Sequence, residues 1–359
     1  MADTSSVLHL PAVYARKMKE LPTYKWWKPV VAALLAFVFF MVFMVVLEVV
    51  YGIAVAVQAT LAGTAQGLST DQIIANLTTA GTGENTSSYL GIDESDPLAL
   101  ANTFLSIAIM IPAIGLACKI MKIGGLRGLS SVEGGLRWKR IATLLPWALL
   151  VIVVFTAIEM GVGVLSGEDI GEVRFVPAAI IVVLIFCPLQ CAAEEYMCRG
   201  FLMQTFGSWI PIVAIPVVLQ ALVFTIMHGY NLYGLIGVCF MGLIAGYLTI
   251  KTGGLEAGIC MHSANNVMSF IMSTLFVSAQ TEVEVSAVSF GVDILLNIVF
   301  LVVLYQVSKR KGYLIEDKPA APADPAAPAA PVDPAAPAAP VDPAAEPAAP
   351  AAPAAESEA

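Results

Sequence analysis

"CAAEEYMCRG", residues 191–200, ends one of the most apolar stretches of the chain with two adjacent glutamates and an arginine. A charge near the centre of a bilayer costs at least about 2.5 kcal/mol on insertion scales. The carboxylates therefore need partners, either on their own helix or on neighbouring ones. Glu195 and Arg199 are four residues apart, so on a helix they share a face and we expect them to pair. That pairing leaves Glu194 to find its partners on other helices.

The composition of the whole chain is that of a membrane protein. Of 359 residues, 58% are hydrophobic and only 13% are charged, which is far more apolar than a soluble domain. We predict an all-α, polytopic integral membrane protein with about eight transmembrane helices. The first follows a basic leader without a small-residue cleavage site, so we expect it to be retained. The expected spans are about 30–57, 98–118, 141–165, 175–198, 211–228, 232–250, 255–278 and 287–308.

The basic residues predict the orientation and the domain boundaries. Lys and Arg concentrate in the leader, between the second and third spans, and after the last span, whereas loops 58–97 and 279–286 contain none. By the positive-inside rule the basic segments are cytoplasmic, with both termini on that side. We expect a basic cytoplasmic leader at 1–29, a transmembrane domain at 30–310, and a Pro/Ala-rich cytoplasmic tail at 311–359. Such a tail cannot bury a core and is predicted to be disordered.

Two histidines stand in the same part of the chain as the glutamate pair. Thirty-four residues separate Glu194 from His228, and another 34 separate His228 from His262, so each of the three belongs to a different helix. Asn266 follows His262 by four residues and shares its helix face. A lone histidine in a span is commonly a hydrogen-bonding contact between helices. The concentration of these residues in four consecutive helices indicates a functional site instead.

Three short motifs in this part of the chain resemble those of a known family. "EEYMCR" at 194–199 fits E-E-x-x-x-R, "FTIMH" at 224–228 fits F-x-x-x-H, and "HSANN" at 262–266 fits H-x-x-x-N. In this order they resemble the CAAX protease and bacteriocin-processing (CPBP) family, which includes type II CAAX prenyl endopeptidases. The resemblance covers about residues 175–275. It implies a four-helix catalytic core and an intramembrane endopeptidase that cleaves a peptide bond near the cytoplasmic half of the bilayer.

The resemblance also implies roles for individual residues. Glu194 would be the base that activates water, and His228 would help to hold or activate that water. His262 and Asn266 would donate hydrogen bonds to the tetrahedral oxyanion. Desolvation of Glu194, the carboxylate without a local cation, suits it to the role of a base.

A metal-dependent version stays open beside this one. Glu195 and Arg199 are expected to support the helix in either case. Two histidines and a carboxylate form the ligand set of a hydrolytic zinc site, here His228, His262 and Glu194. The H-E-x-x-H spacing of soluble zinc proteases is absent. We therefore favour glutamate-activated water without a cofactor, with zinc as the alternative.

The expected partners follow from the predicted class. They are the lipid bilayer and a peptide or protein substrate, including membrane-associated ones, and no nucleic acid. The Ala- and Val-rich spans and the Pro/Ala tail suggest a bacterial plasma membrane, where peptide maturation, bacteriocin processing or immunity fit better than a prenylated substrate. One alternative is a proton-coupled transporter or channel that uses the same Glu and His residues; we see no inverted repeats that would favour it. The other is a catalytically silent bacteriocin-immunity protein of the same fold.

Overall fold

The computed structural model describes residues 11–80, 96–167, 172–277 and 285–315. The compact unit is Met1–Asp317, and the predicted Pro/Ala-rich tail lies outside the described residues from 316 onward. The predicted boundaries of the leader and the tail therefore stay predictions. The helices are α2 (Val13–Arg16), α3 (Lys28–Ala65), α4 (Thr70–Ala80), α5 (Pro97–Ala108), α6 (Met110–Ile120), α7 (Gly125–Ser130), α8 (Trp138–Leu165), α9 (Pro177–Glu195), the π-helix η1 (Tyr196–Leu202), α10 (Met203–Trp209), α11 (Ala214–Ile226), α12 (Leu232–Thr252), α13 (Glu256–Leu275) and α14 (Ala287–Arg310).

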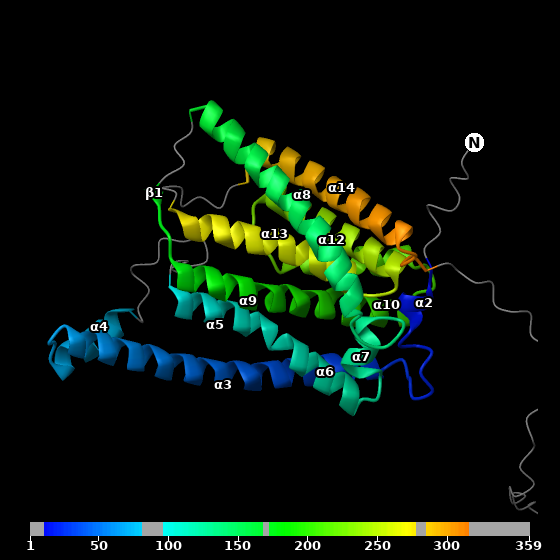
Figure 1. The fold of residues 1–359 in the computed structure, drawn as a ribbon. Helices are drawn as coiled ribbons and strands as arrows, with labels where there is room; N and C mark the ends of the chain where they lie inside the picture. The colour runs from blue at the N-terminus through cyan, green and yellow to red at the C-terminus, as the bar shows by residue number, and fades with distance from the viewer. Residues whose placement is uncertain (1–10, 81–95, 168–171, 278–284, 316–359) are drawn as a thin grey trace, which may run out of the picture. The chain divides into compact units, whose positions relative to one another are not determined.

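The predicted all-α membrane fold is confirmed, and Figure 1 shows the long helices packed into one bundle. Within the described residues, six helices are long and apolar enough to cross a membrane: Lys28–Ala65, Pro97–Ile120, Trp138–Leu165, Pro177–Trp209, Leu232–Thr252 and Ala287–Arg310. The other two expected spans are also helices. The first, α11, has only 13 residues, fewer than the roughly 20 that a straight span needs. The second, α13, has 20 residues and is less apolar because it carries the polar site.

The outer helices present apolar side chains outward. On α3, the side chains of Phe37 and Val45 are 63% and 61% exposed. In water such a surface would drive aggregation. In a bilayer it meets hydrocarbon, while the intrahelical hydrogen bonds satisfy the backbone. The exposed faces therefore fit a lipid environment.

The span that contains the glutamate pair changes its winding at the pair. Pro177 begins α9 at a position that suits proline, because the first turn needs no N–H donor there. Directly after Glu195 the chain continues as the π-helix Tyr196–Leu202 and then as α10. Single-turn π segments inside α-helices are frequent at functional sites. Here the segment carries Arg199.

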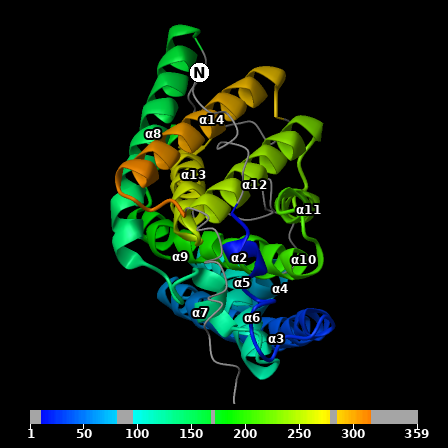
Figure 2. The same cartoon turned by 90° about the vertical axis from the view of Figure 1, so that its right-hand side faces the viewer.

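The two ends of the bundle differ in charge. One end holds α2, α7, the turn between α12 and α13, and the C-terminal end of α14 (Figure 1); we call it the basic end because most Lys and Arg residues lie in or beside these segments. Figure 2 shows α2 from this side, where Arg16 of α2 donates to the Pro211 carbonyl at 2.6 Å. At the opposite end, the two-residue strands β1 (Glu172–Val173) and β2 (Phe276–Val277) pair antiparallel.

Candidate active site

The two adjacent glutamates at the end of α9 have different surroundings. Arg199 Nη1 lies 2.9 Å from Glu195 Oε1, and both side chains are fully buried. The predicted pairing of Glu195 with Arg199 is thus confirmed. The guanidinium carbon of Arg199 also lies 4.4 Å from the centre of the Phe224 ring, a cation–π contact that offsets part of the cost of burying the charge. Glu194 has no such cation on its own helix.

His262 of α13 connects the two carboxylates. Its Nδ1 lies 3.1 Å from Glu195 Oε1, and its Nε2 lies 3.3 Å from Glu194 Oε2. The imidazole is buried, with 2% of the side chain exposed. With Nδ1 protonated, the ring donates to Glu195 and turns its Nε2 lone pair towards Glu194. Glu195 thereby fixes the orientation of the ring, as the carboxylate does in other acid–base sites.

Asn266 lies one helical turn after His262 and completes the group. Its Nδ2 lies 3.2 Å from His262 Nε2, and its Oδ1 accepts a hydrogen bond of 3.2 Å from Asn265 Nδ2. The bond from Asn265 orients the amide, so that the N–H donors of Asn266 face the histidine and the space beside Glu194. Glu194, His262 and Asn266 therefore come together as predicted from the sequence.

Glu194 has an unusual deficit of hydrogen-bond donors. Its Oε2 is buried and accepts no hydrogen bond from any described residue, and its 3.3 Å approach to His262 Nε2 is an ion pair only when the imidazole is protonated. With Nδ1 protonated, Glu194 Oε2 and His262 Nε2 are two acceptors that face each other. The two atoms are too close for a water molecule to lie between them, and with Nδ1 protonated Nε2 already accepts from Asn266 Nδ2 at 3.2 Å. A water molecule beside Glu194 can donate a hydrogen bond to Oε2. The arrangement is therefore suited to holding and deprotonating water.

A glycine allows α13 to approach the glutamate pair. A Cβ atom added to Gly258 would lie only 2.5 Å from Glu195 Oε2. Gly258 precedes His262 by four residues, so it lies on the same face of α13, one turn closer to the basic end. Any larger residue would push His262 away from Glu195. No sequence pattern singles out this glycine, because only the packing of two helices reveals its role.

His228 is not brought to the same point. It lies just beyond the C-terminal end of α11, half-buried, with Nδ1 2.8 Å from the Phe224 carbonyl oxygen. The Phe224 ring centre lies 4.7 Å from the ring centre of His228 and 5.7 Å from that of His262. Phe224 is thus in contact with both imidazoles. The helix α11 is short and ends at Ile226. His228, the histidine of the second motif, therefore lies beyond the helix and outside the buried group.

The residues of the zinc alternative are not grouped as a ligand set among the described residues. Within the part of the chain that the structure describes, no group of three or more His, Cys, Asp or Glu side chains is placed to hold a metal ion. A hydrolytic zinc site needs three protein ligands around one point. His228 Nδ1 lies 2.8 Å from the Phe224 carbonyl oxygen, and His228 is not grouped with His262 and Glu194 among the described residues. We therefore derive no chemical step through a metal.

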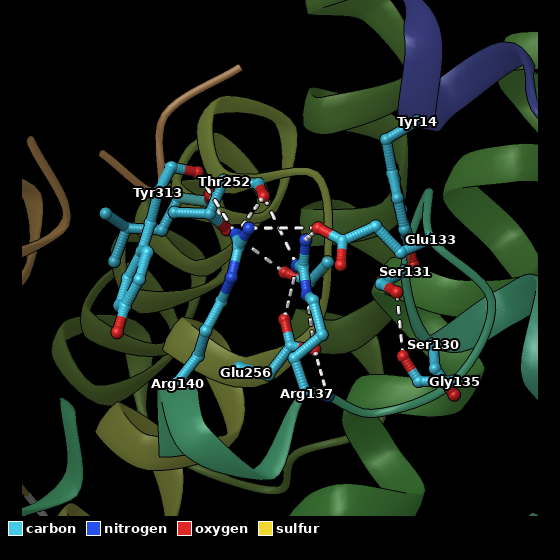
Figure 3. A network of polar contacts seen from close by, with 12 residues as sticks. Tyr14, Ser130, Ser131, Glu133, Gly135, Arg137, Arg140, Thr252, Glu256 and Tyr313 are labelled. Carbon is cyan, nitrogen blue, oxygen red and sulfur yellow. Dashed lines mark hydrogen bonds and ion pairs between the residues drawn. The ribbon is translucent and has the colours of Figure 1, made fainter. Parts of the chain in front are cut away.

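A buried ion-pair network at the basic end fixes the start of α13 (Figure 3). Glu256, in the first turn of α13, is 1% exposed. It accepts hydrogen bonds from the Arg137 backbone N–H at 2.9 Å, from Nε at 3.0 Å and from Nη2 at 2.6 Å. Burial lowers the pKa of Arg137, but the hydrogen bonds and negative charges of Glu256 and Glu133 together outweigh it, and the pKa is raised overall. We call Glu133, Arg137, Arg140, Thr252 and Glu256 the arginine clasp.

The clasp ties several segments to the turn between α12 and α13. Arg137 Nη2 and Arg140 Nη1 donate to the Thr252 carbonyl at 3.2 and 3.0 Å. Arg140 also donates to the carbonyl of Tyr313 at 3.1 Å, beyond the end of α14. Six residues separate Glu256 from His262, about 9 Å along a helix. The clasp is not evident from the sequence, because Arg137 and Arg140 belong to an expected basic loop and Glu256 to the start of an expected span more than 100 residues away.

The comparisons with known proteins agree with this constellation of helices and residues. Residues 176–268 match the family model described as "Type II CAAX prenyl endopeptidase Rce1-like". This stretch of the chain is therefore similar to an Rce1-like type II CAAX prenyl endopeptidase domain, and it includes Glu194, Arg199, His262 and Asn266. The suspected family resemblance is confirmed over these residues.

One curated relative extends the similarity beyond this domain. The "Uncharacterized protein YyaK" of Bacillus subtilis (strain 168) is 28% identical over 188 residues, which are 48% of this chain and 61% of that protein. The chain thus spans about three-fifths of the length of the relative it matches. No solved structure matches at a significant level.

Proposed function

We propose that the protein is an intramembrane endopeptidase in which Glu194 activates a water molecule to hydrolyse a peptide bond. The observation that carries the proposal is the buried Glu194 Oε2, which has no hydrogen-bond donor among the described residues and lies 3.3 Å from His262 Nε2. The Rce1-like domain supports the reaction class. The residues that surround Glu194 support its role in that reaction.

The proposed reaction needs only groups of this chain and water. Water bound beside Glu194 transfers a proton to the carboxylate as its oxygen attacks the carbonyl carbon of the substrate. The carbonyl oxygen becomes an oxyanion, to which Asn266 donates a hydrogen bond, together with His262 when Nε2 is protonated. The intermediate then collapses, the C–N bond breaks, and Glu194 returns the proton to the leaving amine. No external oxidant or second substrate is required.

Glu194 and Glu195 have different roles in the proposed reaction because their partners differ. Arg199 forms a 2.9 Å ion pair with Glu195, and Glu195 in turn orients His262 through Nδ1. Glu194 lies beside this pair without a cation of its own. Acid–base hydrolysis needs a base beside a hydrogen-bonding group of fixed orientation, here Glu194 beside His262.

We further propose that the substrate reaches the site from the cytoplasmic half of a bacterial plasma membrane. The cations of the basic end favour the cytoplasmic side, and His262 lies only about 9 Å along α13 from the clasp at that end. The glutamate pair ends α9, which begins at Pro177 shortly after β1, so the pair lies at the end of α9 away from the strands. A peptide or protein held at the cytoplasmic interface fits this depth.

The test is to reconstitute the full chain in proteoliposomes and to measure two signals on the same preparation. One is cleavage of membrane-anchored peptides, followed by mass spectrometry, and the other is proton uptake across the vesicle membrane. We expect cleavage by the wild type and no proton flux. Proton flux without cleavage would instead identify a transporter, and absence of both signals would indicate a catalytically silent protein.

A further inference from the structure

A groove at the basic end lies outside the candidate active site. Its volume is about 600 Å³, and it runs between α6, α7 and the segment that follows α2. Along α6 it is lined by Pro112, Gly115, Leu116 and Lys119. These positions follow the i, i+3, i+4, i+7 pattern of a single helix face. The groove therefore has one continuous wall that is apolar for most of its length and ends in a cation.

Three cations surround the charged end of the groove. Lys119, Lys122 and Arg127 all line it, and all three are exposed. Among the described residues, none of the three forms an ion pair with a carboxylate, and Arg127 makes only a long hydrogen bond of 3.4 Å to the Gly134 carbonyl. Cations that are close together and not neutralised raise the local potential and favour an anionic ligand.

Lys122 occupies the left-handed backbone position that closes α6, where lysine is uncommon. Lys122 has φ 57°, and it is the one non-glycine residue with positive φ in the part of the chain that the structure describes. It follows the end of α6, where Ile123 N–H closes the helix on the Cys118 carbonyl at 2.9 Å. Glycine is usual at this position of a helix C-terminus. A lysine has a backbone cost there that glycine would not have, and its side chain lines the groove.

We propose that this groove binds an anionic glycerophospholipid. Lys119, Lys122 and Arg127 would hold the phosphate, and an acyl chain would lie along the apolar stripe that includes Pro112 and Leu116. The position agrees, because α6 is the second half of the candidate span Pro97–Ile120, so its end lies at the level of the headgroups. The apolar wall favours a lipid over free phosphate. The proposal does not depend on proteolytic activity.

The first test measures lipid affinity on the purified full chain by native mass spectrometry in detergent. We expect phosphatidylglycerol to bind in preference to phosphatidylcholine. The double variant Lys119→Gln/Lys122→Gln should lower the affinity for phosphatidylglycerol more than about tenfold. The matched control Lys309→Gln/Lys311→Gln removes the same charge from the same end but outside the groove, and it should leave the affinity close to that of the wild type. Equal losses in the two double variants, or equal affinity for both lipids, would overturn the proposal.

The second test separates ligand binding from folding. Lys122→Gly relieves the backbone strain, so it should raise the Tm of the lipid-free protein and still weaken phosphatidylglycerol binding. Unchanged lipid affinity in this variant would remove Lys122 from the site. Soluble glycerol 3-phosphate distinguishes the two sources of phosphate. If it displaces the lipid at equal concentration, the groove is a phosphate site and the lipid assignment is wrong.

Discussion

Arg199 and Glu195 form a fully buried ion pair, with 2.9 Å between Nη1 and Oε1. Removing one partner of a buried pair leaves an uncompensated charge and costs about 3–5 kcal/mol. We therefore expect Arg199→Ala and Glu195→Gln each to lower the free energy of unfolding in detergent. The double variant should recover part of the loss, with a coupling energy of about 0.5–3 kcal/mol. Strictly additive losses in this double-mutant cycle would show that the two residues do not stabilise each other.

The arginine clasp offers a comparison between a buried and an exposed carboxylate of one network. Glu256 is 1% exposed and Glu133 is 60% exposed, and both lie within 3.0 Å of Arg137 nitrogens. We expect Glu256→Ala to destabilise the protein by about 3–5 kcal/mol. Glu133→Ala, the control, should cost less than about 1 kcal/mol because water screens that pair. Chemical unfolding in detergent measures both, and equal effects would contradict the assigned burial.

The clasp also defines how far the chain can be shortened. Ile315 N–H donates to the Lys251 carbonyl at 2.7 Å, and Arg140 donates to the carbonyl of Tyr313. Truncation after Asp317 keeps these contacts, so we expect unchanged activity and membrane insertion. Truncation after Lys311 removes them and should lower the Tm. A loss of activity on truncation after Asp317 would make the Pro/Ala-rich tail a recognition element.

Replacing His262 and replacing His228 should affect catalysis in different ways. His262 connects both carboxylates, so His262→Ala should lower kcat by about 10²–10³ with little change in the shape of the pH profile. His228, whose ring packs against Phe224, should keep most of kcat when replaced by alanine and should shift the pH profile instead. Steady-state cleavage over a range of pH values compares the two variants. Equal losses of kcat would place both histidines at the reacting atoms.

The same preparations test for a metal. If Glu194 activates water unaided, a chelator should leave the cleavage rate unchanged in the wild type. In a zinc enzyme, chelation should abolish cleavage, added zinc should restore it, and both histidine variants should lose the metal. Near-stoichiometric zinc in active protein would thus contradict the metal-free reaction.

The sequence was sufficient to predict the fold class and most of the buried residues of the candidate active site. Apolar length marked the spans, and the four-residue spacing of Glu195 and Arg199 predicted their pairing, although the chain is a π-helix there. The spacing of His262 and Asn266 likewise placed both on one face. These features are local, because each depends on a helix period or a run of apolar residues.

The features that sequence analysis missed depend on packing between segments far apart in the chain. Glu256 and Arg137 are 119 residues apart, and each alone resembles an exposed charge. Gly258 matters only because Glu195 lies against it. The position of His228 depends on the residue at which α11 ends, and hydropathy does not determine helix ends to that accuracy.

Glu194 is the residue on which the proposed reaction depends, and a conservative substitution tests it. Glu194→Gln keeps the size and polarity of the side chain but removes the base. We predict that its single-turnover rate of peptide cleavage, measured in proteoliposomes, falls at least about 10³-fold. Glu48→Gln, which changes an exposed glutamate of α3 that is 3.3 Å from Asn102 Nδ2, should cleave at the rate of the wild type. A Glu194→Gln protein that folds normally and cleaves as fast as this control would contradict the role of Glu194 as the base.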